Sequence, residues 1–257
     1  MSVSKKKRRG FWRQSREALT VWGAASVAVF AFIVLIIITL VMHINDIKSH
    51  EVEPLTIQKI IKANTSGADK LMIVAHPDDE TLWGGGHLMD GGYLVVSITG
   101  GRDKERSEEF IKAVKASGNT PLLLEYPDKV NFERDSWELV HEGIQHDIDL
   151  LVSYKRWSLI VCDNPSGEYG HDHHRMVSGL VTHSCTELGT MDRLWYFGSY
   201  YSKGRIGDYK QLLTPLDDER LDFKKYLLSF YHSQKETLEK FSQMVPYEMW
   251  VPAKEWN

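Results

Sequence analysis

Short apolar runs recur along the chain from about residue 70 onward, and longer segments with apolar residues at helical spacing separate them. Runs of four to eight apolar residues that end at turn residues predict buried strands, whereas spacing of three and four predicts helices. Strands are therefore expected at 71–75, 94–99, 121–125, 158–162 and 194–200, and helices at 103–117, 136–150, 174–187 and about 217–242.

The alternation of strands and helices predicts the fold class. Parallel strands joined by right-handed helical crossovers build such a pattern, so we expect an α/β, Rossmann-like, mostly parallel sheet with helices on both faces. Gly84-Gly85-Gly86 leads from the first strand into a short helix. This run lacks the G-x-G-x-x-G spacing of a dinucleotide-binding loop, so it does not indicate a nucleotide cofactor.

A different pattern precedes this domain. Leu19 to Met42 is a run of 24 residues without a charged side chain, and about 20 apolar residues suffice to cross a bilayer. The run exceeds the apolar core of an ordinary cleaved signal peptide. We therefore expect one N-terminal transmembrane helix.

Charge indicates how this helix is oriented. Residues 1–18 carry seven Lys or Arg and one Glu, a net charge of +6, and the chain as a whole carries −4, which leaves −10 on the remainder. Cationic flanks stay in the cytoplasm. We expect a single-pass protein of the cell membrane with a cytoplasmic N-terminus and the acidic domain outside. The negative charge of this domain argues against a nucleic-acid partner.

These patterns divide the chain into four parts. Residues 1–18 form a basic cytoplasmic tail and residues 19–42 the transmembrane helix. Residues 43–69 mix polar and apolar groups and are expected to form a juxtamembrane stalk with a short helix near 57–63. The remainder, 70–257, is long enough for one domain with its own core.

Candidate chemistry appears where the first strand ends. His76-Pro77-Asp78-Asp79-Glu80 follows the apolar run directly, and the carboxyl ends of strands are where open α/β sheets place their ligand sites. One imidazole and three carboxylates in five residues are costly to bury unless a metal ion pairs with them.

A second cluster follows a later strand. Gly170-His171-Asp172-His173-His174-Arg175 comes soon after the strand expected at 158–162. Imidazole and carboxylate are good zinc ligands, and three protein ligands with one open position are typical of a catalytic site. Together the two clusters predict a Zn²⁺ site, or a site for another divalent metal, at the edge of the sheet.

These motifs resemble those of the PIG-L/LmbE family of metal-dependent N-acetylglucosaminyl de-N-acetylases. The family's A-H-P-D-D-E corresponds to Ala75–Glu80, and its H-x-x-H-R corresponds to His171–Arg175. Further similarities are Thr99-Gly100, the R-x-x-E segment that begins at Arg106, and a Ser-Gln pair at Ser233-Gln234. The resemblance covers roughly residues 70–243 and implies the same Rossmann-like fold.

The resemblance implies a role for each matching residue. His76, Asp79 and His174 would be the metal ligands, Asp78 the general base, and His171 the group that stabilises or protonates the oxyanion. Glu80 would hold a ligand or nearby backbone in place. Arg102 and Asp128 are candidates for contacts with substrate hydroxyl or phosphate groups.

The chain departs from the family pattern at His173, where the family has Asp. A shifted alignment would make His173 the third ligand instead of His174. We favour His174 because Arg175 and His171 then keep their family positions.

The resemblance and the anchor together imply a membrane-anchored, zinc-dependent de-N-acetylase. Its substrate would be N-acetylglucosamine, or a related acetamido sugar, in a cell-surface or lipid-linked glycan. One alternative is deacetylation of a small-molecule N-acetylglucosamine glycoside of the thiol-precursor type. The other is a metal-binding or glycan-binding protein without turnover, which only His173 favours.

Overall fold

The computed structural model describes the backbone of residues 3–256, with the side chains of Trp22 and of residues 25–256. The side chains of the expected basic tail, residues 1–18, lie outside this description. The chain divides into two compact units, Met1–Lys48 and Ser49–Asn257. From Val3 onward the first unit belongs to one long helix, α1 (Val3–His50), in which Ala25–His50 is long and apolar enough to cross a membrane. A signal sequence near the N-terminus can meet the same criteria of length and composition.

The second unit is built on a six-stranded sheet with the order β3-β2-β1-β6-β7-β8. Five strands are parallel and β8 is antiparallel to β7. The α/β, mostly parallel architecture expected from the sequence is confirmed. The strands are β1 (Lys70–Val74), β2 (Tyr93–Thr99), β3 (Thr120–Tyr126), β6 (Leu159–Cys162), β7 (Leu194–Phe197) and β8 (Trp250–Pro252).

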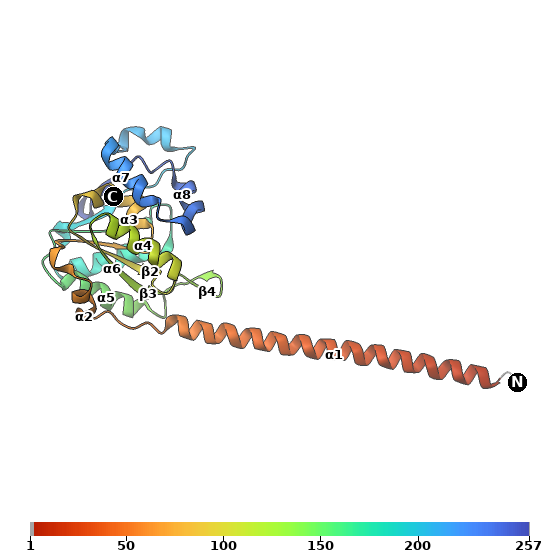
Figure 1. Cartoon of the computed structure of the whole chain (residues 1–257). Helices are drawn as coiled ribbons and strands as arrows, with labels where there is room; N and C mark the ends of the chain where they lie inside the picture. The colour runs from red at the N-terminus through yellow and green to blue at the C-terminus, as the bar shows by residue number, and fades with distance from the viewer. Residues whose placement is uncertain (1–2, 257) are drawn as a thin grey trace. The chain divides into compact units, whose positions relative to one another are not determined.

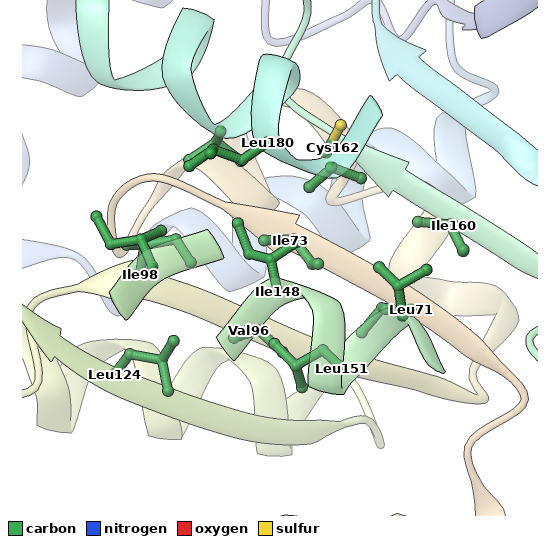
Figure 2. Packing of buried hydrophobic residues seen from close by; sticks show 14 of the residues in the cluster. Leu71, Ile73, Val96, Ile98, Leu124, Ile148, Leu151, Ile160, Cys162 and Leu180 are labelled. Atoms are coloured by element: carbon green, nitrogen blue, oxygen red, sulfur yellow. The ribbon is translucent and has the colours of Figure 1, made fainter. Parts of the chain in front are cut away.

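Helices cover both faces of the sheet, and the alternation along β1 shows why (Figure 1). Leu71 and Ile73 point to one face, where they pack with α5 (His141–Ser153) and α6 (Asp172–Glu187). Figure 2 shows this layer. Met72 and Val74 point to the other face, which is covered by α3 (Asp79–Gly84), α4 (Lys104–Ala116), α7 (Asp218–Leu228) and α8 (Lys235–Phe241). A strand buried on both sides reads as a continuous apolar run.

The segment before β1 is part of the second unit. It contains α2 (Ile57–Lys62) and a 3₁₀ turn at Thr65–Gly67. Ile60 is fully buried, and the Leu55 amide donates to the Asp147 carboxylate on α5 over 3.0 Å. The compact unit thus begins at Ser49, which is earlier than the boundary at residue 70 placed by sequence analysis.

Three elements differ from the expected ones. The helix expected from 136 begins at His141, because Trp137 has a φ of +59°, outside the right-handed helical region. Before it, residues 129–134 form a hairpin of β4 (Lys129–Val130) and β5 (Glu133–Arg134). The long helix expected over about 217–242 is broken between α7 and α8 by a 3₁₀ turn at His232–Gln234. The helix expected after the glycine run begins inside the acidic motif, at Asp79, and a 3₁₀ turn at His87–Asp90 follows it.

Candidate active site

The two histidine clusters meet at the carboxyl edge of the sheet. His76 follows β1, and the loop after β6 leads to His171 and the first turn of α6. β1 has β2 on one side and β6 on the other, so the connections diverge at this point of the sheet. Open α/β sheets form their ligand crevice where the strand order reverses in this way.

Three ligand atoms form a triangle at this edge. His76 Nδ1 lies 3.2 Å from Asp79 Oδ2 and 3.2 Å from His174 Nε2, and His174 Nε2 lies 3.2 Å from Asp79 Oδ2. All three residues are buried. Ligands on a tetrahedral zinc ion with bonds of about 2.0–2.1 Å are about 3.3 Å apart. The nitrogen and oxygen donors therefore fit a divalent ion in both chemistry and spacing.

The other side of His174 supports this fit. His174 Nδ1 is hydrogen-bonded to Glu168 Oε2 and lies 3.7 Å from Asp163 Oδ1. A histidine that binds metal through one nitrogen usually donates from its second nitrogen to a carboxylate. Asp163 also accepts the Ala75 amide over 2.9 Å, and Glu168 accepts the Asn164 amide over 2.8 Å. The loop after β6 thus fixes the direction in which His174 points.

Asp78 is held in an unusual backbone conformation. Its φ is +118°, in a region of backbone conformation that residues other than glycine rarely adopt. Backbone strain of this kind concentrates at functional sites. Its amide donates to Glu80 Oε2 over 3.0 Å, while Arg106 donates to Asp78 Oδ1 over 3.3 Å and to the Pro77 carbonyl over 2.7 Å. Gly100 makes room for this loop, because a Cβ there would lie 2.3 Å from the Pro77 ring.

Asp78 and Asp79 are adjacent, but their surroundings shift their pKa values in opposite directions. Burial favours the neutral form of each. For Asp79 the charges and hydrogen bonds of His174 and His76 outweigh burial and lower the pKa well below its usual range. For Asp78 burial and the neighbouring Asp79 raise the pKa to about 8, although Arg106 opposes the increase. Neighbouring acids with divergent pKa values are typical of sites where one binds and the other transfers protons.

Glu80 lies behind the motif and does not line the cavity beside it. Its carboxylate accepts hydrogen bonds from the Asp78 amide, the Thr81 hydroxyl and the Tyr231 hydroxyl. Burial raises its pKa to about 7. Glu80 therefore connects the loop after β1 to the segment that follows α7.

A cavity of about 240 Å³ opens beside the triangle. His171 lines it, and its buried Nδ1 has no hydrogen-bond partner among the residues that the structure describes. Burial, with the charges of His76 and His174, lowers the pKa of His171 to about 2. A neutral imidazole therefore lines the cavity, and its unpartnered Nδ1 is buried. The cavity is lined by His76, Asp78, Asp79, Arg106, Asp128, Lys129, Arg134, Tyr169, His171, Gln234, Thr237, Lys240 and Phe241.

His173 lies on the opposite side of His76 from the triangle. Its Nδ1 is 3.1 Å from His76 Nε2, and its ring is stacked on Trp137 with 4.0 Å between the ring centroids. Burial, with charge on His76, lowers its pKa to about 4. The two candidates for the third ligand therefore border His76 at different nitrogens, and only His174 lies beside Asp79.

The structure separates the two candidates for substrate contacts. Asp128 lines the cavity and lies 3.3 Å from His76 Nε2 and 3.4 Å from Arg106. Arg102 lines an adjoining cavity of about 550 Å³ and donates to the carbonyls of Ser49 and Glu51. Of the two, Asp128 is the one at the triangle.

Comparison with known proteins bears on the fold. No family model matches the chain. It is 27% identical over 213 residues to the uncharacterized protein L374 of Acanthamoeba polyphaga mimivirus, a match that covers 76% of this chain and 85% of that protein.

Three solved structures are similar. The A40926 pseudoaglycone deacetylase Dbv21 is 18% identical, with a TM-score of 0.50 over 70% of this chain and 87% of its own. The N,N'-diacetylchitobiose deacetylase of Pyrococcus horikoshii is 13% identical, with a TM-score of 0.50 over 80% of this chain and 96% of its own. The conserved protein TT1542 of Thermus thermophilus is 16% identical, with a TM-score of 0.50 over 72% of this chain and 94% of its own. The chain shares its fold with all three.

Sequence reasoning missed several residues that shape this site. Asp163 directly follows a strand end, as His76 nearly does, and this position could have identified it. Glu168 lies in an irregular loop with a φ of +49°, and no pattern marks it. The sequence marks Arg106 only as part of a motif, yet it contacts Asp78. The motif residues Glu109 and Ser233 are joined by hydrogen bonds of 2.8 and 2.6 Å, which attach α4 to the turn before α8.

Proposed function

We propose that this protein is a membrane-anchored, zinc-dependent de-N-acetylase of the PIG-L/LmbE family. It hydrolyses the acetamide of N-acetylglucosamine, or a related acetamido sugar, in a cell-surface or lipid-linked glycan. The observation that carries the proposal is the triangle of His76, Asp79 and His174 donor atoms, with Asp78 and His171 lining the same cavity. Two proteins of the same fold are named as deacetylases, one of them for a diacetylated chitobiose.

The proposed roles follow from the contacts. His76, Asp79 and His174 hold a divalent ion. Such an ion supplies Lewis acidity, which polarises the acetamide carbonyl and acidifies water. Asp78 is the general base that accepts a proton from the attacking water. His171, just before α6, lines the same cavity and stabilises the oxyanion of the tetrahedral intermediate.

The second half of the reaction needs a proton for the departing nitrogen. When the C–N bond breaks, Asp78 donates the proton that it accepted from water, and acetate and the free amine leave. Arg106 keeps the Asp78 carboxylate in place, since it contacts both Asp78 and Asp128. Asp128 lies at the same cavity and is positioned to accept a hydrogen bond from a sugar hydroxyl.

Acetate release provides the test. Metal-loaded protein should release acetate from glycans that contain N-acetylglucosamine, and a chelator should abolish the release. Asp78→Asn should keep the metal but lose about 10²–10⁴-fold in kcat, because a general base typically contributes that much. His174→Ala should lose the metal as well as the activity.

His183→Ala, an exposed position on α6, serves as the control and should behave as the parent protein. If metal-loaded protein released no acetate from any acetamido sugar, the function would have to be abandoned.

The anchor is a separate part of the proposal. The helix that contains Ala25–His50 stays on the protein and spans the membrane, with its basic flank in the cytoplasm. We expect the intact chain in the membrane fraction after alkaline extraction, with the compact unit digested when protease is added to intact cells. A soluble product shortened at its N-terminus would identify the helix as a cleaved signal instead.

A further inference from the structure

His173 connects a backbone carbonyl to His76. Its Nε2 lies 2.7 Å from the carbonyl oxygen of Asp135, and its Nδ1 lies 3.1 Å from His76 Nε2. The ring is fully buried and lies almost parallel to Trp137, at an angle of 5°. Asp135 and Trp137 are themselves joined, since Asp135 Oδ1 accepts the Trp137 amide over 2.7 Å. One short segment therefore fixes both the hydrogen-bonding partner and the plane of the His173 ring.

This arrangement determines where the protons lie. A carbonyl oxygen can only accept, so the hydrogen of neutral His173 is on Nε2 and its Nδ1 is an acceptor. The group 3.1 Å away, His76 Nε2, must then be the donor. A second acceptor, Asp128 Oδ1, lies 3.3 Å from the same nitrogen and favours the same tautomer.

This tautomer determines which nitrogen of His76 is available in the triangle of donor atoms. In neutral His76, the form that can bind a metal ion, a hydrogen on Nε2 leaves Nδ1 with a free lone pair. Nδ1 is the atom that lies 3.2 Å from both Asp79 Oδ2 and His174 Nε2. The chain of contacts from the Asp135 carbonyl through His173 thus presents the lone pair of His76 to the other two donor atoms.

We propose that His173 is a positioning residue that fixes the tautomer and orientation of His76 as a metal ligand. The inference rests on the proposed metal site and deepens it. It also gives a reason for the departure from the resembling family, which has Asp at this position. A histidine whose Nε2 is bonded to a carbonyl accepts a hydrogen from its neighbour as a carboxylate would, without adding negative charge.

The test compares variants of the full-length protein by metal affinity. His173→Phe keeps a flat ring on Trp137 but removes both nitrogens. We expect it to bind one equivalent of Zn²⁺ or Co²⁺ with about 10–100-fold lower affinity, the usual cost of losing a partner behind a ligand. His173→Asn places an acceptor near the position of Nδ1 and should retain affinity within a few fold. His183→Phe, an exposed histidine on the same helix, is the matched control and should bind as the parent does.

Two further measurements, the Co²⁺ spectrum and kcat, show whether His173 positions His76, only fills space, or binds the metal itself. The visible spectrum of bound Co²⁺ should change in His173→Phe and be restored in His173→Asn, and kcat should recover in both at saturating metal. Equal affinity and identical spectra in the parent and His173→Phe would show that His173 only fills space. Loss of all metal binding in both the Phe and Asn variants would make His173 a ligand itself, which also overturns the inference.

Failure of the proposed function is distinguishable from these outcomes. In that case the parent protein itself would bind no divalent ion in chelator competition, or would bind it and release no acetate. Thermal unfolding of each variant without metal shows whether it is folded, and His173→Asn keeps the inference testable if the Phe variant does not fold.

Discussion

At the scale of single residues, Glu168 illustrates how a neighbouring side chain can control the proposed metal ligand His174. Its carboxylate is bonded to His174 Nδ1, so it holds the ring and increases the basicity of the opposite nitrogen. Glu168→Gln keeps the size and an acceptor but removes the charge. We expect metal affinity to fall about 10–100-fold, measured by competition with a chelator of known affinity.

Glu187→Gln, an exposed acid at the end of the same helix, is the control for the loss of one negative charge. Equal affinities in the Glu168 variant and the parent would show that Asp163, at 3.7 Å from the same nitrogen, orients the ring by itself.

Residues adjacent to strand ends were predictable, and their partners were not. Apolar runs place His76 and Asp79 at the carboxyl edge of the sheet, because strand polarity fixes which end of the run faces the crevice. Glu168 reaches the same crevice from a loop with no periodicity. Its contact with His174 depends on a left-handed residue and on the bonds around Asn164, which only the three-dimensional structure shows.

At the scale of elements, the β4–β5 hairpin contains a strained turn. Asn131 and Phe132 have φ values of +51° and +73°, and the Phe132 side chain is 101% exposed. Two-residue turns of this kind favour glycine at the second position. Phe132→Gly should therefore stabilise the protein by about 0.5–1 kcal/mol. This is the free energy gained by relieving the left-handed strain, minus the entropy that glycine loses on folding.

Thermal unfolding checks this, with an expected increase in Tm of about 2 °C for a unit of this size. Phe132→Ala is the matched control, because it removes the aromatic ring but keeps the Cβ and the strain. An equal gain in both variants would show that the exposed ring, not the backbone, is the cause. A loss in Phe132→Gly but not in Phe132→Ala would show that the entropy cost of glycine exceeds the strain.

Periodicity predicted the long elements and failed for short ones. The five parallel strands were located to within a few residues, because each is an apolar run bounded by turns. The strands of the hairpin are two residues each and β8 is three, too short for any period to appear. The break after α7 falls at Ser229–Tyr231, where neither Gly nor Pro marks it; there Tyr231 turns inward to bond Glu80.

At the scale of the whole compact unit, one buried ion pair joins three distant parts of the chain. Glu248, just before β8, lies 2.9 Å from Lys224 on α7, and both side chains are fully buried. The same carboxylate accepts the amides of Gly86 over 2.7 Å and His87 over 3.1 Å. The C-terminal segment is thereby attached to the turn that follows α3.

This pair predicts how stability depends on pH. Burial alone raises the pKa of Glu248, but Lys224, His87 and the Gly86 amide outweigh it and lower the pKa to about 2. A carboxyl with a lowered pKa stabilises the fold above its unfolded pKa of about 4.3, and the stabilisation is lost as pH falls towards 2. The difference corresponds to about 3 kcal/mol. Burial also lowers the pKa of Lys224, although Glu248 opposes the decrease.

Comparison with Glu248→Gln isolates this contribution. The variant leaves the charge of Lys224 buried without a partner, which typically costs about 3–5 kcal/mol at neutral pH. The free energy of unfolding, measured with denaturant on metal-free protein from pH 7 to pH 2, should differ most between parent and variant above pH 4.3. The two curves should converge as pH falls from 4.3 towards 2, because protonation of the unfolded parent progressively removes this stabilisation. Glu219→Gln, an exposed acid on α7, should follow the parent at every pH. A difference that stayed constant down to pH 2 would mean that the hydrogen bonds to Gly86 and His87, not the charge, hold the C-terminal segment in place.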